Sequence, residues 1–117
     1  MAKKRIGRFY FKLTDSKNLI GEFSNSDDKR IYAESADRKI QDTAHKSFDG
    51  VYYHTWGHYY DNGDFEGVVA KLEIKAKSPN IFTLEWEIQN DKKDKLWGEG
   101  MLCDGMLIGD YRDFQNP

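Results

Sequence analysis

Two carboxylates near the end of the chain have a spacing that suggests acid–base chemistry. The dipeptide Asp104-Gly105 is typical of a two-residue type I′ hairpin turn, and pairing around it places Glu99 directly opposite Asp110. Opposed carboxylates repel each other, and such a pair can share a proton and act as acid and base. The same register places Trp97 beside Arg112, which either neutralises the acidic pair or stacks on the indole. Glu99 and Asp110 are therefore candidate catalytic residues, with a solvated structural pair as the alternative.

The histidines and the single cysteine are the other reactive side chains. His54 and His58 share one face of a predicted strand, about 13 Å apart at about 3.3 Å per residue, so one metal ion cannot bind both. A metal site would need one of them together with ligands from another strand or His45. Cys103 has no histidine near it in sequence, and no serine lies in a Gly-x-Ser-x-Gly elbow. We therefore predict no metal, no cofactor and no nucleophilic motif.

Period-two alternation between turn signals defines the elements that must position these groups, while helical periodicity is nearly absent. The 117 residues suffice for one core, so we predict a single domain over 1–117. The expected fold is all-β, one antiparallel eight-stranded meander closed or nearly closed into a barrel. A short helix capped by Ser35, or a lid, is expected within 36–49. The predicted strands are 5–13, 18–25, 29–36, 50–60, 64–76, 81–89, 95–103 and 106–113.

Glycines favour closure of the sheet over an open sandwich, which is the alternative. Eight of the ten glycines lie at or inside predicted strands, where glycine is normally depleted. Glycine permits the sharp bends that a coiled sheet needs, and closure removes exposed edge strands.

The turn signals also predict which residues face the interior. If Asn62-Gly63 forms a two-residue turn, the odd-numbered residues of 50–60 face inward and the even-numbered residues face outward. A one-residue slip would exchange these faces. Inward aromatic and hydroxyl side chains would line a lumen for a small, partly apolar ligand, although a filled core is the alternative. The predicted ligand-binding residues are Tyr53, Thr55, Tyr59, Trp86 and Tyr111.

The outward positions hold more large apolar side chains than a monomer surface needs. This pattern predicts a partner face, most simply a homodimer, unless 36–49 or the termini cover it. The outward set comprises Tyr52, Trp56, Tyr60, Phe65, Val69, Met101, Cys103, Met106 and Ile108.

Short motifs resemble the calycin-type barrels, which include avidins, lipocalins and fatty-acid-binding proteins. The segment 48–52, Phe-Asp-Gly-Val-Tyr, is similar to the Gly-x-aromatic opening of their first strand. The segments 82–86 and 96–98 are similar in rhythm to late avidin strands. The avidins' polar biotin-contacting set has no counterpart here. The resemblance implies a cup-shaped barrel that binds a small molecule.

Charge and composition narrow the partners. Eighteen basic and twenty acidic side chains give a net charge of −2, which recruits neither nucleic acid nor anionic membrane. No apolar run suits a membrane span or a signal peptide, and a lone cysteine fits a reducing compartment, so we expect a cytoplasmic protein. Three functions follow as hypotheses: a ligand-binding barrel, a structural or interaction module, and a small isomerase or hydrolase.

Overall fold

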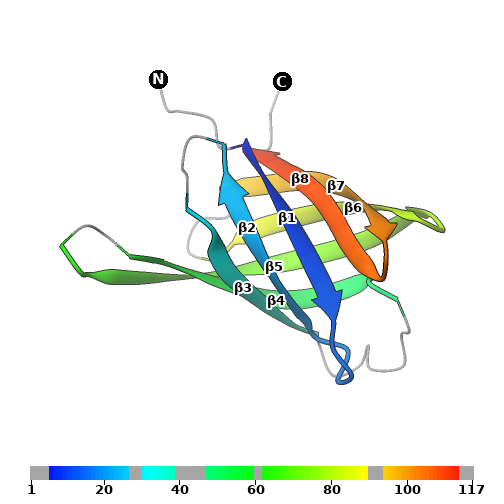
Figure 1. Cartoon of the computed structure of the whole chain (residues 1–117), viewed down its shortest axis with the longest axis horizontal. Coiled ribbons are helices and arrows are strands. Elements are labelled where there is room, and N and C mark those ends of the chain that lie inside the picture. The colour runs from blue at the N-terminus through cyan, green and yellow to red at the C-terminus, as the bar shows by residue number, and fades with distance from the viewer. Residues whose placement is uncertain (1–5, 27–29, 39–46, 60–61, 90–93, 114–117) are drawn as a thin grey trace.

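The computed structural model of the chain is a closed antiparallel barrel in which each strand pairs with its sequence neighbours and the first pairs with the last (Figure 1). The predicted all-β meander and its closure are confirmed. The structure describes residues 6–26, 30–38, 47–59, 62–89 and 94–113. The strands are β1 (Ile6–Leu13), β2 (Leu19–Asn25), β3 (Tyr32–Arg38), β4 (Gly50–Tyr59), β5 (Phe65–Ser78), β6 (Ile81–Ile88), β7 (Lys95–Cys103) and β8 (Met106–Asp113).

Glycines bring neighbouring strands close together where the barrel bends. A Cβ atom added at Gly21 would lie 1.9 Å from the carbonyl oxygen of Tyr10 on β1. One added at Gly109 would lie 2.3 Å from the carbonyl oxygen of Glu99 on β7. Both distances are far inside van der Waals contact, so these positions require glycine and support the link between strand glycines and coiling.

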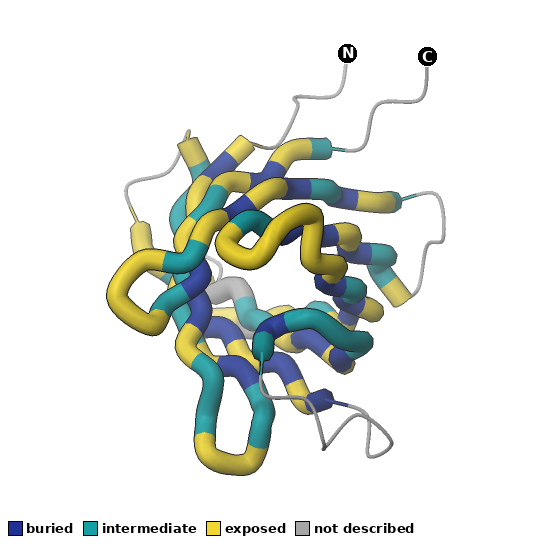
Figure 2. The backbone as a smooth tube through the Cα atoms, turned by 90° about the vertical axis from the view of Figure 1, so that its right-hand side faces the viewer, coloured by how far each residue is buried: buried dark blue, intermediate teal, exposed yellow. Residues whose placement is uncertain are grey.

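The barrel interior is packed with alternating side chains from all eight strands, and buried and exposed residues alternate along the tube in Figure 2. On β7 and β8 the predicted orientations are confirmed for Tyr111, which is buried, and for Met101, Cys103 and Ile108, which are exposed. Asp104 and Gly105 both have positive φ, 54° and 79°, as a type I′ turn requires. The buried hydrophobic residues are Phe9, Phe11, Leu19, Ala36, Phe48, Tyr52, Ala70, Leu72, Ile74, Phe82, Leu84, Trp86, Leu96, Leu107 and Tyr111.

On β4 the predicted faces are wrong. Tyr59 pairs with Phe65, which leaves five residues between the strands instead of the two of a type I′ turn. Gly63 has positive φ whereas Asn62 does not, and the Asn62 side chain accepts a hydrogen bond from the Asp64 amide at 2.9 Å. The register is therefore shifted by one residue, and Tyr52, His54 and Trp56 face inward.

The predicted helix in 36–49 is also wrong where the structure describes this segment. Strand β3 continues through Arg38 and pairs with β4, so Ser35 is a strand residue and caps no helix. Residues 39–46 lie outside the described residues. Phe48, just before β4, is buried in the core. No helix in the described part of the chain is long and apolar enough to cross a membrane.

Arg38 closes the end of the barrel that contains the β1–β2 turn. Its side chain donates hydrogen bonds to the carbonyl oxygens of Lys17 (2.8 Å), Asp49 (2.7 Å) and Ser47 (2.7 Å), and to the Tyr52 hydroxyl. This end is therefore filled by a buried cation whose donors are satisfied.

Candidate functional site

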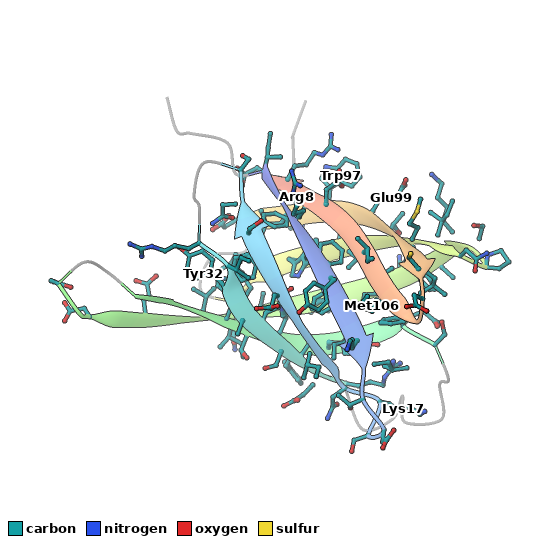
Figure 3. All side chains as sticks on the ribbon, in the orientation of Figure 1. Arg8, Lys17, Tyr32, Trp97, Glu99 and Met106 are labelled. Atoms are coloured by element: carbon teal, nitrogen blue, oxygen red, sulfur yellow. The ribbon has the colours of Figure 1, made fainter. Side chains whose placement is uncertain are left out.

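A half-enclosed cavity of about 120 Å³ lies toward the opposite end of the barrel, where β2, β4, β6 and β8 finish. Tyr32, at the start of β3, and Lys17, in the β1–β2 turn, mark the two ends in Figure 3. The walls of the cavity are mostly aromatic. Its lining residues are Phe9, Phe23, Asn25, Glu34, His54, Trp56, Trp86, Leu96 and Tyr111.

A histidine and a carboxylate face each other inside the barrel next to this cavity. Alternation along β3 directs Glu34, Ala36 and Arg38 inward, and the shifted β4 register directs His54 inward. His54 Nε2 lies 2.8 Å from Glu34 Oε2. The two residues are 2% and 8% exposed, so the contact is removed from solvent. Charged side chains are almost never buried to this extent unless they are paired.

Each member of the pair also has a second polar atom without a partner. Among the described residues, nothing forms a hydrogen bond with Glu34 Oε1 or with His54 Nδ1, although both atoms are buried. Leaving a buried polar atom unsatisfied costs about 1–3 kcal/mol. Native structures rarely keep such atoms without water, an ion or a ligand to satisfy them.

Aromatic rings fix the imidazole and form the walls around it. The ring centre of His54 lies 5.0 Å from that of Trp56, 5.6 Å from that of Phe11 and 6.2 Å from that of Trp86. Such contacts stabilise one orientation of each ring. The site therefore places one polar pair among aromatic rings.

Tyr111 and Asn25 supply a second polar contact among the lining residues. The Tyr111 hydroxyl donates a hydrogen bond to Asn25 Oδ1, and the Tyr111 ring meets Phe23 edge-on at 6.2 Å. This contact links β8 to the end of β2. The polar groups of the cavity thus come from β2, β3, β4 and β8.

The structure brings two of the five predicted ligand-binding residues to the cavity. Trp86 and Tyr111 line it. Tyr53 is 53% exposed on the outer surface, and Thr55 is exposed beside Ser35, with 3.2 Å between the hydroxyl oxygens. Their predicted inward orientation is wrong because the β4 register is shifted. The Tyr59 side chain lies outside the described part of the structure.

Sequence reasoning missed the buried pair itself. The two-residue turn placed His54 outside, and Glu34 in its strand had no assigned face. The alternation of Glu34 with Ala36 was the available signal, because it puts the carboxylate on the side of a small apolar residue. Had the predicted β4 register turned Tyr52 inward, it would also have placed His54 in the barrel interior.

Glu99 and Asp110 are directly opposite each other on β7 and β8, as predicted. Both are exposed on the outer surface, and each has a basic neighbour of its own. Lys77 Nζ lies 3.2 Å from Glu99 Oε2, and Arg112 Nη2 lies 3.8 Å from Asp110 Oδ2. This separate pairing favours the solvated structural alternative.

The predicted contact between Trp97 and Arg112 is also present. The guanidinium carbon lies 4.9 Å from the centre of the indole, within the range of a cation–π interaction. Arg112 therefore contacts both the indole and Asp110.

The predicted outer aromatic face loses two of its main members. Tyr52 is fully buried and Trp56 lines the cavity, because the β4 register turns both inward. Val69, Met101 and Ile108 are exposed as expected. Tyr60 and the Phe65 side chain lie outside the described residues. The three members that stay exposed are not aromatic, whereas Tyr53, which was predicted to face inward, is an exposed aromatic residue of β4.

Within the described residues, no three His, Cys, Asp or Glu side chains gather closely enough to hold a metal ion. Comparisons with protein-family models, curated proteins and solved structures found no match.

Proposed function

We propose that this barrel binds one small, partly hydrophobic molecule in the cavity beside His54 and Glu34. The observation that carries the proposal is a buried pair next to an aromatic cavity, in which Glu34 Oε1 and His54 Nδ1 have no hydrogen-bond partner among the described residues. Ligand sites are typically apolar cavities with a few polar groups that set orientation. The remaining hydrogen-bonding capacity of the pair suits that role.

The size of the cavity limits the ligand. An apolar cavity of about 150 Å³ in another protein holds benzene, so a cavity of about 120 Å³ suits a single ring or a smaller body. Larger drug-sized ligands require cavities of about 300 Å³ or more. The ligand class is therefore a ring-sized molecule with one polar substituent.

The two ends of the barrel differ in a way that also suits a ligand-binding barrel. Arg38 and Phe48 fill one end of the barrel, while the cavity lies toward the other. We propose more specifically that the chain is a calycin-like binding protein of the lipocalin or avidin type. The resemblance around 48–52 supports this more specific proposal.

Binding of a simple probe tests the proposal. We expect benzyl alcohol to bind with a dissociation constant of about 1 mM or lower, equivalent to about −4 kcal/mol. Transfer of magnetisation from the protein to benzyl alcohol in NMR would detect this binding. In 15N-labelled protein, the indole N–H signals of Trp56 and Trp86 should shift, and that of Trp97, on the outer surface, should not.

A cavity-filling variant and its control locate the site. Leu96→Phe, in the lining, should weaken benzyl alcohol binding about tenfold or more, whereas Ile108→Phe, on the outer surface, should leave it unchanged. Equal binding by both variants, or no binding to the unmodified protein, would refute the proposal.

A further inference from the structure

We infer that the bound molecule is a small organic cation, a primary ammonium on a ring-sized body, whose N–H groups donate to Glu34. This inference rests on the proposed function and specifies its ligand class. Three features carry it: the charge of the lining, the missing hydrogen-bond donor and the aromatic walls.

The lining is acidic in its formal charge. Among the nine described lining residues, Glu34 is the one carboxylate, and none is lysine or arginine. Arg38 faces the other end of the barrel, where carbonyl oxygens and Tyr52 occupy its side-chain donors. A buried carboxylate is strongly unfavourable unless a positive charge and hydrogen-bond donors compensate it.

The missing partner of Glu34 is a donor. An ionised carboxylate only accepts hydrogen bonds, so Oε1 needs an N–H or O–H group whatever the protonation state of His54. When His54 is neutral and its Nε2–H donates to Glu34 Oε2, Nδ1 is an acceptor as well. Two acceptors without a partner among the described residues and one negative charge then lie beside the cavity. An ammonium group supplies both the donors and the opposite charge.

The walls favour a cation for a separate reason. The faces of Trp, Tyr and Phe rings attract positive charge, by about 2 kcal/mol or more where water is excluded. Trp56, Trp86 and Tyr111 lie around the pair, and Phe9 and Phe23 complete the wall. The same faces and Glu34 disfavour an anion. A ring-bearing ammonium therefore finds one carboxylate and several aromatic rings among the lining residues.

Three probes with the same ring and different charges test the inference. Benzylamine is a cation at pH 7, benzyl alcohol is neutral and benzoate is an anion. We expect benzylamine to bind at least about tenfold more tightly than benzyl alcohol, and benzoate to bind most weakly. Titrations followed by NMR or calorimetry in one buffer would give the three constants.

Removing the charge of Glu34 tests whether this carboxylate causes the preference for benzylamine. Glu34→Gln keeps the shape of the side chain and an acceptor oxygen but removes the charge. The affinity for benzylamine should therefore fall to that for benzyl alcohol, and the affinity for benzyl alcohol should be retained. The matched control is Glu85→Gln, which removes the same charge from the exposed face of β6 and should keep the preference for benzylamine.

The outcomes separate the two proposals. If the three probes bind the unmodified protein equally, or if Glu34→Gln retains the preference for benzylamine, the cation inference is wrong and the binding barrel stands. If none of the probes binds, the proposed function fails as well. Should Glu34→Gln not fold, the probe comparison in the unmodified protein still decides the inference.

Discussion

Arg38 and Tyr52 close one end of the barrel as a unit. The guanidinium carbon lies 4.7 Å from the centre of the tyrosine ring, and the Tyr52 hydroxyl accepts a hydrogen bond from Arg38. The same hydroxyl donates to the carbonyl oxygen of Phe48 at 2.6 Å. One side chain from β3 thus joins the β1–β2 turn, the segment before β4 and β4 itself.

Arg38→Met should destabilise the protein strongly. It leaves several main-chain carbonyl groups without their charged donor, and one hydrogen bond to a charged group contributes about 1.5–3 kcal/mol. We expect a loss of about 3 kcal/mol or more in urea unfolding. Arg112→Met is the control, because that side chain is exposed and its contacts should contribute about 1 kcal/mol or less. Similar losses in both variants would show that Arg38 does not hold this end together.

The buried pair should show strong coupling between its members. His54→Phe leaves Glu34 buried without its partner and should cost about 3–5 kcal/mol, whereas replacing both members with apolar residues often costs little. We therefore expect Glu34→Leu combined with His54→Phe to be more stable than His54→Phe alone. A double-mutant cycle measured by urea unfolding should give a coupling energy of about 3 kcal/mol or more. Additive losses would contradict the pairing.

The strands and the closure of the barrel could be predicted because alternation, turn residues and glycine positions indicate the same structure. On β7 and β8, a true type I′ turn and glycine-rich inward positions specify the same register. On β4, aromatic residues occupy both faces, so alternation could not correct the misinterpreted Asn62-Gly63 turn. Tyr52 and Tyr53 are equally acceptable core residues by type, yet the former is fully buried and the latter is 53% exposed.

The candidate site was less predictable for a different reason. Sequence reasoning directs carboxylates to the solvent because they are rarely buried, and the Glu34–His54 pair departs from that rule. Departures of this kind are expected at functional positions, where local preference yields to the requirements of a site. Trp86 and Tyr111 could be predicted because they belong to strands whose faces were correct.

Two glycines should respond differently to alanine. Gly21→Ala places a Cβ 1.9 Å from a main-chain oxygen, so β1 and β2 must separate, and we expect a loss of about 3 kcal/mol or more. Gly63→Ala meets no atom of the described residues within 4 Å, but the φ of 92° at this position disfavours a side chain by about 1–2 kcal/mol. Urea unfolding of both variants provides the comparison. A larger loss at Gly63 would contradict the close approach of β1 and β2.

Tyr10 should make stability depend on pH in the alkaline range. Its hydroxyl donates a hydrogen bond to the Glu22 carboxylate opposite it on β2, and this bond raises the pKa of Tyr10, with burial and the negative charge of Glu22 acting in the same direction. The raised pKa means that the folded state favours the neutral phenol. The resulting stabilisation is complete below the ordinary tyrosine pKa of about 10 and is lost as pH rises through the raised value.

Spectrophotometric titration of the phenols measures this effect. Tyr10→Phe should remove a late-titrating group, and Glu22→Gln should move that group toward the ordinary value. Glu85→Gln, on the exposed face of β6, is the charge-matched control and should leave the titration unchanged. The stability difference between Tyr10→Phe and the unmodified protein should shrink as the pH passes the raised pKa. A difference that stays constant through that range would show that the hydrogen bond to Glu22 does not stabilise the fold.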